Sequence, residues 1–187
     1  MAEPDTRSGW LPRARRVLSP NCDDWPAGCS PELIVVHGIS LPPGEFGGPY
    51  IDQLFTNQLD ALAHPYFAEI SKLRVSAHFL VRRDGELVQY VPLTRRAWHA
   101  GASNYAGRER CNDFAVGIEL EGEDCTPYTD AQYRQLARLI GELRATQRSL
   151  AAAAVVGHSD IAPGRKTDPG PAFDWSRLRQ LTGEGRA

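Results

Sequence analysis

The sequence predicts an α/β fold in which a mixed central β-sheet is flanked by α-helices. Short apolar runs at residues 33–36 and 153–156 have the composition of strands that are buried on both faces. Apolar residues at helical spacing lie between these runs, and an Asp84-Gly85 turn adds an antiparallel hairpin. Strands and helices that alternate around one hairpin indicate a sheet with both parallel and antiparallel neighbours.

The first part of the chain combines one strand with irregular segments. Residues 1–31 are rich in Pro, Arg and Asp, so we expect an irregular lead-in. The strand at 33–36 follows and carries His37 at its carboxyl end. Residues 41–49 contain three prolines and three glycines, which predicts a long loop beside that strand end, and such loops commonly serve a site. A short helix is expected at 50–55.

The middle of the chain predicts a hairpin and a further strand. Residues 75–81 and 86–91 flank Asp84-Gly85, a dipeptide that favours a tight hairpin turn. In the strand expected at 115–121 apolar and acidic side chains alternate, as a period of two requires. Glu119 and Glu121 therefore share one face of this strand.

The carboxyl-terminal part predicts two helices with defined starting points. Thr129, with Gln132 three residues later, resembles a capping box, and the helical spacing that follows extends to near residue 146. Asp174 can cap a last helix that runs through Leu178 and Leu181. Helices and strands thus continue to alternate up to the end of the chain.

Size and composition limit the kind of protein and its partners. We expect one domain over residues 1–187, since 42% hydrophobic residues can form one continuous core. The net charge of −2 and the absence of like-charge runs argue against nucleic acid and anionic membranes, so a small-molecule or glycan substrate is expected, with no obligate protein partner. We expect a cytoplasmic protein, because no export signal or membrane span is evident, and thiols rather than disulfides.

Two histidines and one aspartate form a candidate zinc site. A catalytic zinc ion needs three protein ligands and keeps a fourth position open. His37 and His158 each follow a buried strand, and Asp168 lies in the proline-stiffened loop after the second strand. Neighbouring strand ends converge on one edge of a sheet, so the sequence predicts that these three side chains meet. Each histidine taken alone also fits an ordinary packing role.

Two further residues have the chemistry to assist hydrolysis. Glu119 can orient a water molecule and receive its proton, although the strand pattern does not separate Glu119 from Glu121, and both fit a solvated sheet face. Lys166 can stabilise the negative oxygen of a tetrahedral intermediate. Only two of the 21 Lys and Arg residues are lysines, which favours a specific role for Lys166 over an exposed loop position.

Other side chains are candidates for the walls of a cleft. The remaining histidines are His64, His78 and His99. They are weaker candidates as ligands, and we assign them to packing or to hydrogen bonds behind the ligands. Trp98 fits either a core aromatic or a surface for a sugar ring. Arg74 and Arg110 can bind a peptide carboxylate, although arginine is so abundant that residues alone favour a solvated role for both.

Several of these segments resemble a known enzyme family. The resembling stretches are residues 35–48, 73–78, 95–101, 107–114, 117–122 and 165–171. They are similar to the zinc-dependent N-acetylmuramoyl-L-alanine amidases of the peptidoglycan-recognition type, and to the cytosolic branch of that family in particular. The resemblance implies a mixed sheet flanked by helices. It also implies cleavage of the amide between anhydro-muramic acid and L-alanine during peptidoglycan recycling, which restrains β-lactamase induction.

The resemblance also assigns residues. It implies zinc held by His37, His158 and Asp168, with Lys166 and Glu119, rather than Glu121, assisting catalysis. It further implies that Arg74 and Arg110 contact carboxylates of the stem peptide. Two departures are evident: Gly38 replaces an expected asparagine, and the residues after His158 differ from the family pattern.

Three alternatives remain open at the level of sequence. The first is an amidase that acts on polymeric murein or intact muropeptides. The second is a non-catalytic module that binds peptidoglycan fragments, although the complete set His37, His158 and Asp168 argues against it. The third is an α/β domain with a structural metal or none, in which Glu119 has no part in a reaction.

Overall fold

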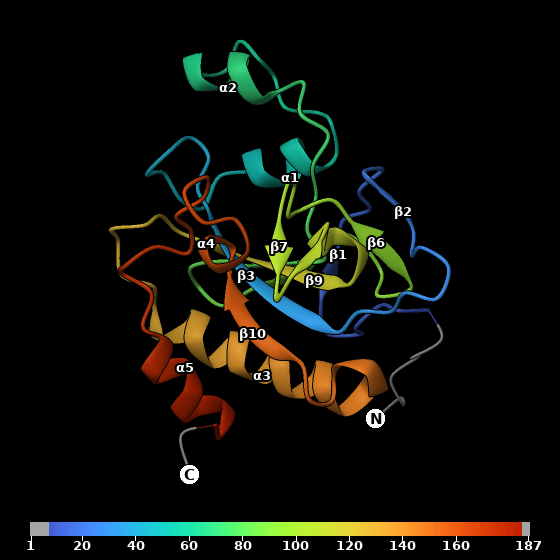
Figure 1. The fold of residues 1–187 in the computed structure, drawn as a ribbon. Coiled ribbons are helices and arrows are strands. Elements are labelled where there is room, and N and C mark those ends of the chain that lie inside the picture. The colour runs from blue at the N-terminus through green and yellow to red at the C-terminus, as the bar shows by residue number, and fades with distance from the viewer. Residues whose placement is uncertain (1–7, 185–187) are drawn as a thin grey trace.

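A computed structural model describes residues 8–184 of the chain (Figure 1). The strands are β1 (Arg15–Arg16), β2 (Cys22–Asp24), β3 (Leu33–Ile39), β4 (Phe79–Val81), β5 (Leu87–Gln89), β6 (Arg95–Ala97), β7 (Asn104–Tyr105), β8 (Arg108–Glu109), β9 (Ala115–Glu121) and β10 (Ala154–Gly157). The α-helices are α1 (Tyr50–Phe55), α2 (Pro65–Ile70), α3 (Asp130–Thr146), α4 (His158–Ile161) and α5 (Trp175–Thr182). Short 3-10 turns occur at Cys111–Asp113 and Arg148–Leu150.

The centre of the molecule is a six-stranded sheet in the order β1-β5-β4-β9-β3-β10. Neighbouring strands are parallel except for β4 and β5, which form the antiparallel hairpin. The predicted α/β fold with a mixed central sheet is therefore confirmed. All side chains of β9 and the first five of β3 are buried, as expected for parallel strands covered on both faces.

Helices cover the two faces of the sheet unequally (Figure 1). The long helix α3 lies on one face with α5 packed against it, and its Leu136, Ile140 and Leu143 share one apolar core with side chains of β3 and β9. Helices α1 and α2 lie on the opposite side of the sheet together with the loops after β3 and β6. Residues of β3 and β9 that point away from α3 therefore face these loops.

Most local predictions are confirmed, and two boundaries are corrected. The capping box of Thr129 and Gln132 is present, and the Asp174 side chain accepts from the backbone N–H of Arg177 at the start of α5. The hairpin strands are shorter than expected, because only three residues on each side of the turn pair. The lead-in is not wholly irregular, since β1 joins the edge of the sheet and β2 pairs with β6.

Two further observations bear on the expectations from composition. None of the helices within residues 8–184 is long and apolar enough to cross a membrane. In the same part of the chain all cysteines are free thiols. Sγ of Cys22 donates to the carbonyl oxygen of Ser19, and Sγ of Cys29 accepts from Arg108.

Candidate metal centre

The pairing of the parallel strands places the candidate residues side by side. His37 of β3 lies directly opposite Glu119 of β9 in the register, so both side chains project from the face that α3 leaves open. Gly157 of β10 pairs with the residue before His37, and His158 follows at once as the first residue of α4. The predicted convergence of two strand ends therefore holds for both histidines.

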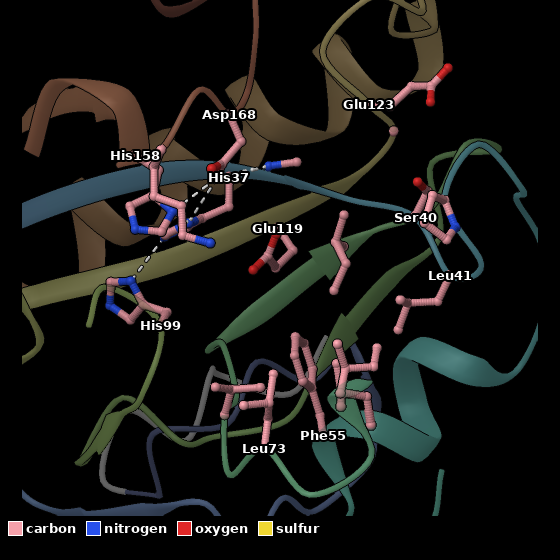
Figure 2. Close-up of a pocket in the computed structure, with 18 of the residues that line it drawn as sticks. His37, Ser40, Leu41, Phe55, Leu73, His99, Glu119, Glu123, His158 and Asp168 are labelled. Carbon is pink, nitrogen blue, oxygen red and sulfur yellow. Dashed lines mark hydrogen bonds and ion pairs between the residues drawn. The ribbon is translucent and has the colours of Figure 1, made fainter. Parts of the chain in front are cut away.

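Three ligand atoms from these segments converge on one point (Figure 2). Nδ1 of His37 and Nδ1 of His158 are 2.9 Å apart. Oδ2 of Asp168 lies 3.1 Å from Nδ1 of His158 and 3.3 Å from Nδ1 of His37. A point just outside the plane of this triangle lies about 2 Å from all three atoms. About 2 Å is the usual distance between zinc and a nitrogen or oxygen ligand. The geometry thus suits one small cation with an open side.

Hydrogen bonds behind the two histidines fix which ring nitrogens carry protons. Nε2 of His158 is 3.3 Å from the carbonyl oxygen of Ala100, which can only accept, so this nitrogen carries the proton. In the neutral ring Nδ1 of His158 then presents a lone pair. Burial lowers the pKa of His37 to about 4, which keeps that ring neutral as well.

His37 is oriented by a second histidine. Nε2 of His37 is 2.9 Å from Nδ1 of His99, and Nε2 of His99 is 3.2 Å from the carbonyl oxygen of Ala115. Because that carbonyl accepts from Nε2 of His99, Nδ1 of His99 must accept from Nε2 of His37. Burial, and then the nearby histidines, hold the pKa of His99 well below its ordinary value, so it remains neutral.

These tautomers leave two imidazole lone pairs and one carboxylate oxygen facing each other. Two acceptor nitrogens 2.9 Å apart cannot hydrogen-bond to one another. Oδ2 of Asp168 is an acceptor as well, and it faces the same two nitrogens at 3.1 and 3.3 Å. A cation at the common centre satisfies all three groups, which is the fit expected of a metal site.

The ring of His99 lies directly on β9, where only glycine leaves room for it. A Cβ atom added to Gly117 would come within 2.4 Å of the His99 ring. The loop after β6 is held in place by Asn112, whose side chain accepts from the backbone N–H groups of His99 and Ala100. Gly117 and Asn112 thus fix the histidine that orients His37.

Glu119 and Glu121 have different surroundings although they share one face of β9. Within residues 8–184, Oε2 of Glu119 is buried and has no hydrogen-bond partner. Burial, and secondarily the charge of Asp168, raise the pKa of Glu119 well above its ordinary value. Oε1 of Glu121 accepts from Arg82 and from the N–H of Gly47, and Oε2 accepts from the N–H of Arg83. Glu119 is therefore the carboxylate that remains available to a reactant.

The three converging side chains lie at one end of a pocket of about 570 Å³. Glu119, Lys166, Trp98 and His99 contribute to the same polar end. The opposite wall is apolar and is formed by α1, α2 and the segments beside them (Figure 2). Its members include Leu41, Leu54, Phe55, Tyr66, Ile70 and Leu73. The pocket can accept a substrate that has both a polar reacting group and an apolar surface.

The profile of the N-acetylmuramoyl-L-alanine amidase family matches residues 27–171, which is most of the chain. The chain belongs to this family. It is 65% identical over 173 residues to the 1,6-anhydro-N-acetylmuramyl-L-alanine amidase AmpD of Salmonella typhimurium (strain SL1344), covering 92% of each protein. The family resemblance and the enzyme class expected from the sequence are confirmed.

Solved structures agree with this assignment. The crystal structure of a Se-Met AmpD derivative superposes with a TM-score of 0.91 at 61% identity, covering 96% of this chain and 99% of that chain. A second amidase, AmiD from E. coli, matches with a TM-score of 0.57 at 28% identity, covering 91% of this chain and 61% of that chain. That structure is a complex with the substrate anhydro-N-acetylmuramic acid-L-Ala-D-gamma-Glu-L-Lys.

The predicted substrate-binding residues occupy different places around this amidase pocket. Trp98 lines it, and its indole N–H donates to Asp23. Arg74 is exposed and follows Leu73 of the pocket wall, but it does not itself line the pocket. Arg110 is 73% exposed at its side chain, contacts Asp113 and borders a separate cavity.

The other histidines have roles that the sequence left undecided. His78 is buried behind the site, where Nδ1 accepts from the N–H of Gly117 and Nε2 donates to the carbonyl of Arg95. His64 accepts from the N–H of Tyr66 at the start of α2. Of these three histidines, only His99 hydrogen-bonds to a candidate metal ligand, which is His37. Its direct contact with His37 had no signal in the sequence, because the two residues are 62 positions apart.

Proposed function

We propose that this protein is a zinc amidase that cleaves the amide between anhydro-N-acetylmuramic acid and L-alanine in muropeptides. The observation that carries the proposal is the convergence of two imidazole lone pairs and the Asp168 carboxylate in a pocket where Glu119 keeps one free oxygen. The name of the AmpD relatives supports the anhydro-muramoyl substrate, and so does the complex of AmiD with an anhydro-muramoyl peptide.

Zinc is the metal that suits the donor set. Two neutral imidazole nitrogens and one carboxylate oxygen are ligands of catalytic zinc sites, which keep their fourth position open. His37, His158 and Asp168 would hold the ion, and the pocket lies on their open side. When bound, zinc lowers the pKa of water to about 7 and polarises a carbonyl oxygen.

Glu119 is the residue that moves protons in this proposal. Its raised pKa, caused by burial, makes the carboxylate a stronger base than an exposed glutamate. Oε2 receives the proton of the attacking water and can then deliver it to the nitrogen of L-alanine as the amide breaks. A proton relay of this kind needs an oxygen without a permanent partner, and Oε2 meets that condition among residues 8–184.

Lys166 and Trp98 act on the substrate in the same scheme. Lys166 is exposed at the rim beside Asp168, where its ammonium group stabilises the negative oxygen that develops as the carbonyl is attacked. Trp98 offers a flat surface to the sugar. We propose that Arg74 and Arg110, which lie outside the pocket, bind carboxylates of the stem peptide beyond the scissile amide.

The biological setting follows from the substrate. An enzyme for anhydro-muropeptides belongs in the cytoplasm, where it recycles cell-wall fragments and so limits β-lactamase induction in bacteria with that pathway. We propose that the chain is one catalytic domain and needs no protein partner.

A digestion experiment tests the proposal against its alternatives. Purified protein with one equivalent of zinc should release L-alanyl peptide from anhydro-muramoyl tripeptide, and faster than from the same peptide on a reducing muramoyl end. The Asp168→Ala variant should release none. If the wild type binds the tripeptide but leaves it intact, the protein is a recognition module. Equal rates on both ends would instead indicate an amidase for intact muropeptides.

A further inference from the structure

Glu121 is a buried carboxylate that the reaction proposed above does not use. It is 1% exposed and lies two residues beyond Glu119 on the same face of β9. Oε1 accepts from the backbone N–H of Gly47 at 2.7 Å and from Nη1 of Arg82 at 3.1 Å. Oε2 accepts from the backbone N–H of Arg83 at 3.1 Å. Three donors thus hold one carboxylate in the interior, where an unpaired charge is very unfavourable.

Arg82, which pairs with Glu121, also bonds to two segments that form walls of the pocket. Its Nη1 also donates to the carbonyl oxygen of Gly48 at 2.8 Å, and its Nη2 lies 3.3 Å from Oδ1 of Asp52 in α1. The guanidinium group is largely buried, and its planar fork allows it to serve three partners at once. Arg82 and Glu121 therefore connect β9 to the glycine-rich loop (residues 41–49) and to α1.

These connected segments contribute to the pocket but not to its reacting end. Leu41 and Pro43 of the glycine-rich loop line the pocket, as do Leu54 and Phe55 of α1. Figure 2 places Leu41 and Phe55 on the side of the pocket away from His158 and Asp168. A loop of this composition has many conformations available to it, so an arrangement that fits a ligand requires fixed contacts.

The loop is held at more than one point. Gly47 and Gly48 are fixed through an N–H and a carbonyl group by the pair of Glu121 and Arg82. The ring of Phe46, between these glycines and Pro43, lies under the guanidinium of Arg83 at 4.8 Å. Glu121 also accepts from the N–H of Arg83. The Glu121 carboxylate therefore binds both arginines that contact the loop.

We propose that Glu121 and Arg82 are positioning residues that fix the glycine-rich loop as a wall of the substrate pocket. They set the affinity for the muropeptide and leave the chemical step to the residues around Glu119. The effect on affinity rests on the proposed function, whereas the effect on the loop does not. Sequence alternation placed Glu119 and Glu121 on one face, and the structure assigns them separate roles.

The variant Glu121→Gln tests this proposal with little change of shape. The amide replaces one acceptor oxygen by a donor and removes the charge opposite Arg82. A hydrogen bond to a charged group contributes enough that its loss should raise the open population of the loop about ten- to a hundredfold. Amide hydrogen exchange of a peptide that spans the loop should accelerate accordingly. KM for anhydro-muramoyl tripeptide should rise about tenfold, with kcat within about twofold of the wild type.

Two further variants keep the test decisive. Glu86→Gln is the matched control, because Glu86 is an exposed carboxylate of the neighbouring hairpin that pairs only with Arg15 among the described residues. It should change neither loop exchange nor KM. Arg82→Lys keeps the charge, but a lysine side chain cannot reach all three partners of Arg82. This variant should therefore accelerate hydrogen exchange of the loop and raise KM, as Glu121→Gln does. It serves as the test variant if Glu121→Gln does not fold.

The readouts separate the inference from the proposed function. Unchanged loop exchange in Glu121→Gln and Arg82→Lys would overturn the inference, and so would a fall in kcat at constant KM. Absence of activity in the wild type would instead refute the proposed function, while hydrogen exchange would still report on the loop.

Discussion

The contact between His37 and His99 leads to a prediction about metal affinity. His99→Phe keeps a ring of similar size on Gly117 but removes the nitrogen that accepts from Nε2 of His37. His37 is 2% exposed, so its N–H would lose its partner in the interior. An unsatisfied buried donor costs about 1–3 kcal/mol, and about 1.4 kcal/mol corresponds to tenfold in an equilibrium constant. Zinc affinity should therefore fall about ten- to a hundredfold, the range seen for groups behind metal ligands.

Competition with a chelator of known zinc affinity measures this effect directly. His99→Asn is the conservative variant, because its amide oxygen can take the place of Nδ1, and it should recover part of the affinity. His78→Asn is the matched control, since His78 is also a buried histidine that packs near His99 but contacts no ligand. It should lower stability and leave the affinity of the folded protein unchanged. Equal zinc affinity in His99→Phe and the wild type would refute the reasoning.

Four other predictions concern catalysis and stability. Glu119→Gln should lower kcat about 10²- to 10⁴-fold while zinc content, measured by atomic absorption, stays the same. Lys166→Ala should reduce kcat more than it raises KM in steady-state assays, since its charge acts on the developing oxyanion. Leu136→Ala, at a fully buried position under the sheet, should lower the free energy of unfolding in urea by about 2–5 kcal/mol. Burial lowers the pKa of His78 to about 4, so as pH falls His78 takes up a proton in the unfolded chain before it does so in the folded protein. The free energy of unfolding of the metal-free protein should therefore decrease between pH 6.5 and 4. The decrease should be smaller in His78→Asn.

Sequence patterns were sufficient for the elements whose local signals agree with the fold. The capping box at Thr129 and the apolar runs before His37 and His158 predicted α3 and the two strands that lead to the proposed ligands. The convergence of His37 and His158 followed from chain topology alone, because parallel neighbouring strands end at the same edge of the sheet. Asp168 was predicted to lie near His158 because only a short loop connects the two residues.

Other features depend on contacts between distant segments. β1 consists of two arginines and has no apolar pattern, so only its pairing with β5 makes it a strand. Glu119 and Glu121 have the same local pattern, and they differ because Gly47 and Arg82 approach only one of them. The apolar pocket wall from α1 and α2 likewise has no local signature that separates it from ordinary core.

The claim that a single ion held by His37, His158 and Asp168 supports amide cleavage is tested most directly by titration. Metal-free protein should receive zinc in sub-stoichiometric steps while release of peptide from anhydro-muramoyl tripeptide is followed. We predict that the rate rises in proportion to added zinc and reaches its plateau at one equivalent, and that Asp168→Ala remains inactive throughout. Full activity without metal, or no cleavage at one equivalent of bound zinc, would contradict the account.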